Sequence, residues 1–103
     1  MTQHTPADIE NMARLALGYA QRLGIESDAG SVYVEKGTPS AGLPWRLYVA
    51  TPINGGSTRH APAFLTDHGF IGWTKAEAFK TLNDVQWALH SALLGLASKG
   101  IRL

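Results

Sequence analysis

Hydrophobic and polar positions follow a helical period near the end of the chain, over residues 72–99. Apolar residues recur there at three- and four-residue steps, the spacing that brings side chains to one face of a helix; they are Ala78, Leu82, Val85, Leu89, Leu93 and Leu96. Thr74 and Glu77 have the spacing of a capping box, in which each side chain accepts a hydrogen bond from the other residue's backbone N–H. Lys99 and Gly100 are stop signals. The pattern predicts one long helix that starts after Thr74.

A second row of residues widens the apolar side of this predicted helix: Phe79, Asn83, Trp87, His90 and Leu94. The clearly solvated positions are fewer: Glu77, Lys80, Asp84, Ser91 and Ser98. A helix this broadly apolar has to be covered on more than one side. Two interpretations stay open. Either the second row packs against another helix of the domain, or Trp87 and Leu94 contact a partner.

The first part of the chain carries a shorter helical pattern. Thr5 is a suitable N-cap and Pro6 suits the first helical position. An apolar stripe then follows, consisting of Ile9, Met12, Ala13, Ala16, Ala20 and Leu23. Gly24 supplies the left-handed residue that ends a helix.

Three strands are expected between the helices. Residues 31–35 and 45–51 are rich in strand-forming residues, and Trp45, Leu47 and Val49 share one face of the second strand, which we expect to end at Pro52. Residues 37–44 contain too many glycines and prolines for regular structure. Asn54-Gly55-Gly56 predicts a chain reversal, and a third strand is expected around residues 59–65, at a sheet edge because Pro62 has no N–H.

The order helix, strand, strand, strand, helix, with short turns between strands, predicts an antiparallel three-stranded sheet with two helices on one face. The 103 residues suit a single α+β domain.

The chain has no cysteine, no signal-peptide pattern and no apolar run long enough to span a bilayer, so we expect a cytoplasmic protein that does not enter membranes. The net charge of +1 divides unevenly, because residues 1–35 carry two basic and five acidic side chains and residues 36–103 carry seven and three.

Catalytic and metal-binding patterns do not fit. The glycine spacing of residues 37–42 matches a phosphate-binding loop, but Leu43 and Pro44 replace the lysine and hydroxyl residue that this motif needs. The four histidines, His4, His60, His68 and His90, include no pair at the four-residue spacing of helical metal ligands. We therefore expect no enzymatic activity, no metal and no cofactor.

The predicted element order resembles that of the double-stranded-RNA-binding domain, which also has a Gly/Pro loop between its first two strands. That family uses lysines at the start of its second helix to reach phosphates, and Lys75 and Lys80 match this in part. The resemblance implies a nucleic-acid-binding module, which is our alternative hypothesis. Such a module would contact phosphates through Lys36, Arg46, Arg59, Lys75 and Lys80. The family's full lysine cluster and its loop histidine are missing from this sequence.

Two short phrases, residues 45–49 (WRLYV) and 70–78 (FIGWTKAEA), look like stretches of small uncharacterised proteins of phages that infect actinobacteria. This resemblance implies a small accessory protein that acts by binding a host protein. Our first hypothesis is a non-enzymatic interaction protein, because the last predicted helix is more broadly apolar than its own domain requires and the chain lacks catalytic groups. It would bind a partner protein or itself as a homodimer, through an apolar surface containing Trp73, Trp87, His90 and Leu94.

Overall fold

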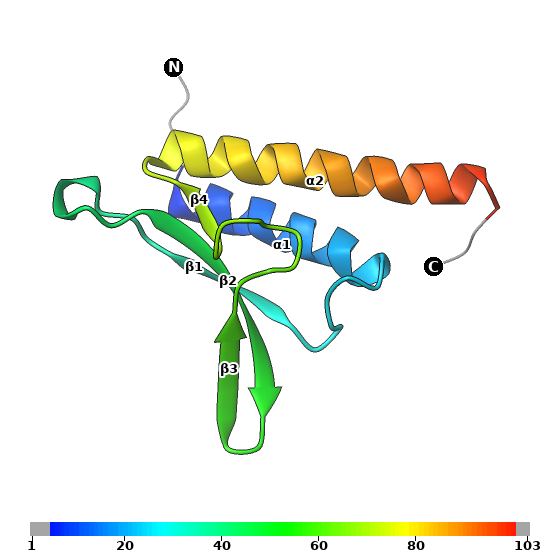
Figure 1. Ribbon diagram of the computed structural model, residues 1–103, viewed down its shortest axis with the longest axis horizontal. Coiled ribbons are helices and arrows are strands. Elements are labelled where there is room, and N and C mark those ends of the chain that lie inside the picture. Colours follow the sequence, from blue (N-terminus) through cyan, green and yellow to red (C-terminus); the bar gives the residue numbers. More distant parts are fainter. Residues whose placement is uncertain (1–4, 101–103) are drawn as a thin grey trace.

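The computed structural model describes residues 5–100, which form two helices and a small antiparallel sheet (Figure 1). Helix α1 spans Pro6–Arg22 and helix α2 spans Lys75–Ser98. Between them lie the strands β1 (Ser31–Glu35), β2 (Trp45–Ile53), β3 (Gly56–His60) and β4 (Phe70–Gly72), and a short 3-10 helix η1 (Pro39–Ala41). Both helices lie on the same side of the sheet, and the β2–β3 hairpin points away from them (Figure 1). The predicted α+β fold class is confirmed.

Both helices begin with a threonine cap. The Thr5 hydroxyl accepts from the Asp8 N–H at 3.2 Å, and the Asp8 carboxylate accepts from the Thr5 N–H at 2.9 Å, which completes a capping box. The Thr74 hydroxyl accepts from the Glu77 N–H at 3.1 Å, as predicted. The Glu77 carboxylate, however, accepts from the Trp73 N–H at 2.9 Å and not from the Thr74 N–H. It therefore fixes the residue before the cap and the direction in which β4 enters α2.

Strand β2 is the centre of the sheet. β1 pairs with one side of it, from Arg46 to Ala50, while β4 and β3 share the other side, at its start and its end. The third strand was expected around residues 59–65 and lies instead at Gly56–His60, directly after the Asn54-Gly55 turn. All five residues of β3 are exposed, so no alternation of apolar and polar residues marked it. The fourth strand, β4, was expected only as the approach to the last helix.

Pro52 does not end β2, as the sequence suggested, because β2 continues to Ile53 and Pro52 pairs with Ser57. β1 pairs with β2 only as far as Ala50, so β2 has a single neighbour at this point. A residue without an N–H is tolerated where one side of a strand is unpaired.

The loop of residues 37–44 is more regular than predicted. Thr38 and Leu43 form an isolated bridge with N–H···O distances of 2.7 and 3.1 Å, and η1 occupies the loop between them. A further tight turn places Gly69 against β2, where its carbonyl accepts from the Leu47 N–H at 2.7 Å. Gly69 has φ 84°, and a Cβ there would collide with the Leu47 carbonyl oxygen, so only glycine fits.

The core lies between the helices and the sheet. Near the start of both helices, Ile9 and Ala13 join one buried cluster, whose other members are Trp45, Leu47, Ile71, Ala78 and Leu82. Near their ends, Ala16 and Ala20 form a second cluster with Leu89. Because early residues of α1 meet early residues of α2 and late residues meet late ones, the helices run parallel. The small alanines of α1 allow this close approach. Phe64, from the loop of residues 61–69, packs against both clusters.

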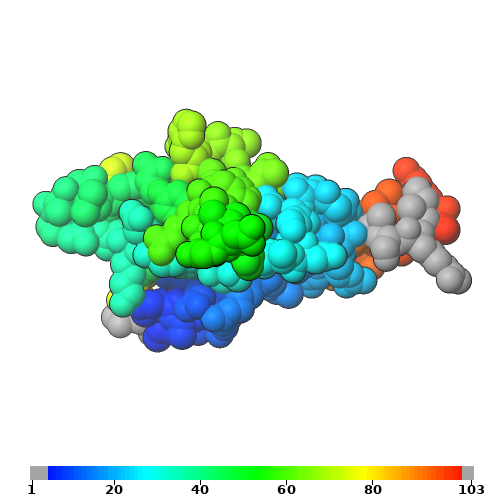
Figure 2. Space-filling view, turned by 90° about the horizontal axis from the view of Figure 1, so that it is seen from below, coloured from blue at the N-terminus to red at the C-terminus, as the bar shows by residue number. Residues whose placement is uncertain are grey.

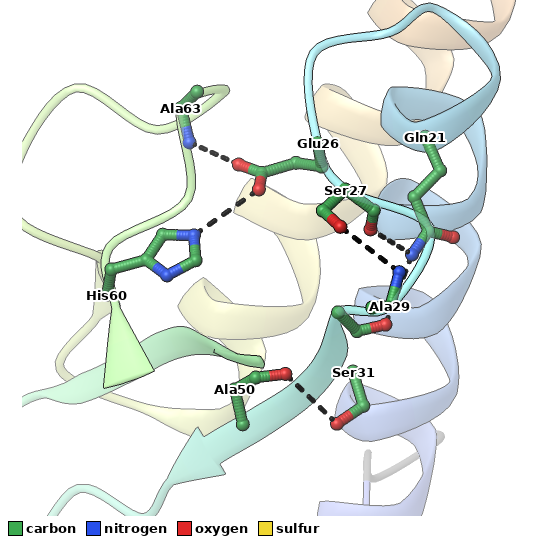
Figure 3. Close-up of polar contacts among 9 residues, drawn as sticks. Gln21, Glu26, Ser27, Ala29, Ser31, Ala50, His60 and Ala63 are labelled. Carbon is green, nitrogen blue, oxygen red and sulfur yellow. Dashed lines mark hydrogen bonds and ion pairs between the residues drawn. The ribbon is translucent and has the colours of Figure 1, made fainter. Parts of the chain in front are cut away.

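A buried carboxylate ties this loop to the segment that follows α1 (Figure 3). The Glu26 side chain is only 5% exposed. One of its oxygens accepts from the Ala63 N–H at 2.7 Å, and the other lies 3.4 Å from Nε2 of His60. The contacts join segments more than thirty residues apart, at the point where β3 leaves the sheet, so Glu26 has a structural role.

The molecule is flat, with extents of 49 × 42 × 22 Å. Figure 2 shows the last turns of α2 extending past the end of α1, so they are covered by fewer neighbours than the rest of the helix. Among the described residues, neither helix is long and apolar enough to cross a membrane.

Candidate functional site

The side of α2 that faces away from the core carries two large apolar residues. Trp87 is 56% exposed and Leu94 is 58% exposed. They are seven residues apart, which is close to two helical turns and places them on one side of the helix. The opposite side of the same helix is buried through Leu82, Leu89 and Leu93. Of the two interpretations of this apolar row, packing within the domain does not account for Trp87 and Leu94.

His90 connects these residues to α1. Its ring stacks on Tyr19 with centroids 5.1 Å apart and planes at 17°, and it lies 5.7 Å from the Trp87 ring at 48°. Leu15, one turn before Tyr19 on α1, is 42% exposed. We call the group Leu15, Tyr19, Trp87, His90 and Leu94 the helix-layer surface. It spans both helices on the side opposite the sheet.

Sequence reasoning missed the contribution of α1 to this surface. Leu15 and Tyr19 lie outside the predicted apolar stripe of α1, at a spacing of four residues that marks a shared face. This spacing could have identified them as a pair. Nothing in the sequence, however, placed Tyr19 beside His90, because that contact depends on the parallel packing of α1 and α2.

Trp73 was predicted to join Trp87, His90 and Leu94, but the structure places it elsewhere. It precedes the N-cap of α2, and a rise of about 1.5 Å per residue puts Trp87 about 20 Å further along the axis. Trp73 instead packs edge-on against Phe70 of β4, with ring centroids 5.8 Å apart. It is 45% exposed and belongs to the opposite end of the helix.

The five basic residues of the nucleic-acid hypothesis lie on several different elements. Arg46 and Arg59 lie on the sheet face away from the helices, because the alternate residues Trp45, Leu47 and Val49 point into the core. Lys75 and Lys80 lie on α2, and Lys36 follows β1.

Three of these five side chains also have partners within the chain. The Arg59 guanidinium lies 3.7 Å from the centre of the Tyr33 ring. Arg46 donates to the His68 carbonyl at 3.1 Å, and Lys80 pairs with Asp84 at 2.9 Å. Phosphate binding would have to compete with each of these contacts.

The histidines form no metal site in the part of the chain that the structure describes. Within residues 5–100, no group of three or more histidine or acidic side chains is placed to hold a metal ion. His60 lies near Glu26, His68 is in the turn before β4, and His90 is in the aromatic stack. His4 lies outside the described residues.

A hollow of about 350 Å³ lies between α1 and β1, lined by Arg14, Leu17, Gln21, Gly30, Ser31 and Val32. Its polar groups are engaged within the chain. The Gln21 amide donates to the carbonyls of Ser27 and Gly30 at 2.9 and 3.1 Å, and Arg14 pairs with Glu10 at 2.6 Å. Among the described residues that are not exposed, no buried side-chain nitrogen or oxygen lacks a hydrogen-bond partner. The hollow therefore presents no polar group that needs a ligand.

Comparison with known proteins gives no relative from which a role could be carried over. No protein-family model matches the chain, and no curated protein or solved structure is significantly similar to it. The candidate site rests on the geometry of this chain alone.

Proposed function

We propose that this chain is a non-enzymatic interaction protein that binds protein through the helix-layer surface. The observation that carries the proposal is the exposure of Trp87 and Leu94, at 56% and 58%, on a helix whose other side is packed. Contiguous apolar groups of this kind on a small domain are typical of interaction sites. Tryptophan and tyrosine are the residues most enriched among those that dominate binding energy.

The stack of His90 between Tyr19 and Trp87 adds to this argument. The rings hold one another in place across two helices. A side chain that is already ordered loses less conformational entropy on binding than a free one. The surface therefore combines exposed apolar side chains with ring contacts between the two helices, a combination that favours protein recognition.

The experiment compares Trp87→Ala and Leu94→Ala with Trp73→Ala, a matched control because Trp73 is an exposed tryptophan outside the surface. Association is measured in two ways: the mass of the purified chain across a concentration series, and retention of proteins from a nuclease-treated lysate of the natural host. We expect Trp87→Ala and Leu94→Ala to reduce at least one association by tenfold or more, the effect of losing about 1.4 kcal/mol, and Trp73→Ala to leave it unchanged.

Equal association by all three variants would contradict the proposal. The nuclease treatment separates this proposal from the alternative function, nucleic-acid binding. Association that depends on nucleic acid bound through Lys36, Arg46, Arg59, Lys75 and Lys80 would be lost when the nucleic acid is digested. Direct binding to duplex DNA or RNA that weakens steeply as salt rises would support that alternative.

A further inference from the structure

The exposed side of α2 carries more residues than Trp87 and Leu94 alone, and together they indicate what kind of partner binds there. Trp87 and Leu94 belong to a continuous row at three- and four-residue steps, and every member of the row is exposed; its residues are Asp84, Trp87, Ala88, Ser91, Leu94, Gly95 and Ser98. We call this row the outer strip. The spacing is that of a helix seam that packs against one other helix.

The outer strip lacks charge over most of its length. Residues 85–98 contain no Asp, Glu, Lys or Arg, although the strip is exposed. At a rise of about 1.5 Å per residue this is about 21 Å of helix. A partner that covers it must also be uncharged there, because an unpaired buried charge is costly. The same segment of a second copy satisfies this requirement.

Charges at the two ends of the strip favour an antiparallel arrangement. Asp84 is at one end, where it also pairs with Lys80 of its own helix at 2.9 Å, and Lys99, the residue after α2, is at the other. In a parallel pair of helices each Asp84 would face the same acid of the second copy, and each Lys99 the same base. In an antiparallel pair centred on Ser91, each Asp84 lies opposite Ser98 of the second copy and beside its Lys99. Opposite charges then meet at both ends.

The sizes of the side chains fit the same arrangement. With Ser91 on the two-fold axis, Trp87 faces Gly95 of the second copy and Leu94 faces its Ala88, so that each large residue meets a small one. Gly95 is exposed in the interior of α2, and nothing lies within 4 Å of where its Cβ would be. A glycine costs about 1 kcal/mol in a helix interior relative to alanine. Packing within one copy gives no reason for that cost, whereas a tryptophan from a second copy does.

We propose that the outer strip binds the outer strip of a second copy of this chain, as an antiparallel helix pair with its two-fold axis at Ser91. This inference rests on the proposed function and names the partner of Trp87 and Leu94, the two residues that the outer strip shares with the helix-layer surface. A single strip is small beside standard interfaces of about 800 Å² per partner, so we expect a dimer that dissociates on dilution.

Cysteine cross-linking tests this geometry directly, because the chain has no cysteine of its own. Helix axes that pack 8–10 Å apart bring facing Cα atoms to within about 6 Å, close enough for a disulfide. Ser91→Cys on the axis should therefore form a disulfide-linked dimer under mild oxidation, at least tenfold faster than Ser40→Cys. Ser40, exposed in η1, is the matched control. Trp87→Ala added to Ser91→Cys should slow the reaction to the control rate.

A second test exchanges the charges at the two ends of the outer strip. Asp84→Lys alone should weaken the dimer by roughly tenfold, because it places like charges beside Lys99 of the second copy. Asp84→Lys combined with Lys99→Glu should restore the wild-type dissociation constant, measured by sedimentation.

The outcomes separate the two proposals. Fast Ser91→Cys cross-linking together with rescue by the charge exchange supports the dimer. Cross-linking of Ser91→Cys no faster than that of Ser40→Cys overturns it. Self-linking of Ser98→Cys as fast as that of Ser91→Cys also overturns it, because it would mean a parallel pair. If the chain stays monomeric while lysate proteins are retained through Trp87, the dimer is wrong and the proposed function stands. If no association depends on Trp87, both are wrong.

Discussion

The two halves of α2 are buried in the same way on one side but differ on the other. Ala78 and Leu82 in the first half and Leu89 and Leu93 in the second all reach the core. On the outer side, the first half carries Glu77, Lys80 and Asp84, whereas residues 85–98 carry no charged side chain. The buried side shows how the helix belongs to its own domain. The outer side distinguishes a half with charged side chains from a half without them.

The first half is also fixed more firmly to the rest of the chain. Thr74 and Glu77 accept hydrogen bonds from the backbone at its start, and β4 runs directly into it. Gly72 approaches so closely that a Cβ there would lie 2.6 Å from the Cβ of Glu77 and 2.8 Å from the Ala78 nitrogen. The second half has no sheet strand beneath its end, which extends past α1 (Figure 2).

The largest expected effect comes from shortening one leucine in each half. Leu82→Ala should lower the free energy of unfolding by about 2–5 kcal/mol, because Leu82 is fully buried and its removal leaves a cavity. Leu94→Ala should leave it nearly unchanged, because an exposed side chain loses little packing. Denaturant unfolding at concentrations where the chain is monomeric measures both. Equal losses would mean that both halves of the helix are core.

Removing the cap of the first half should have a smaller effect. Thr74→Ala should cost about 1 kcal/mol, since the Glu77 N–H loses the hydroxyl that accepts from it. Thr74→Ser keeps an oxygen at this position and serves as the control. A change near zero in Thr74→Ala would show that the first turn is held by the Glu77–Trp73 contact alone.

Gly95→Ala sharpens the comparison because two measured quantities should change in opposite directions. The monomer should become more stable by roughly 0.5–1 kcal/mol, as expected for alanine in place of glycine in a helix with open space around it. Self-association should weaken, because the added methyl group occupies the place of Trp87 of the second copy. Gly18→Ala in α1, also with open space around its Cβ position, is the control: it should stabilise the fold and leave association unchanged. Stabilisation without weaker association would remove Gly95 from the interface.

The smallest expected effect is at the exposed ion pair of the first half. Lys80→Ala should cost about 0.3–0.5 kcal/mol, the usual value for a pair four residues apart on a helix surface. The cost should shrink as salt is added, because the pair is exposed. A loss above 1 kcal/mol that does not depend on salt would indicate that Lys80 also contributes through packing.

Local signals in the sequence predicted most of the elements correctly. The caps at Thr5 and Thr74, the end of α1 at Gly24 and the bounds of β1 all follow from side chains within a few residues of one another. Gly24 has φ 78°, and the Ile25 N–H donates to the Ala20 carbonyl at 2.9 Å, the helix ending that this glycine predicts. Such features depend on short-range geometry, which the order of residues fixes.

Strand β3 is an element whose bounds local sequence signals did not predict. Its residues are exposed on both sides, so neither apolar alternation nor burial identified them; what places them in a sheet is pairing with β2 after the Asn54-Gly55 turn. The extension of β2 through Pro52 has the same origin, because the extra residues Pro52 and Ile53 are in the strand through their pairing with Ser57 and Gly56 of β3.

The sequence alone determined the fold class, the caps, the buried stripe of each helix and the presence of a wide apolar row on α2. Each of these depends on the period of side chains along one element. Only the tertiary structure decided which part of that row remains exposed, because exposure depends on where α1 lies. The parallel packing of the helices buries Leu89 and Leu93, stacks His90 on Tyr19 and leaves Trp87 and Leu94 uncovered. The distance of Trp73 from them, by contrast, follows from its place before the N-cap of α2, because the rise per residue along the helix sets it.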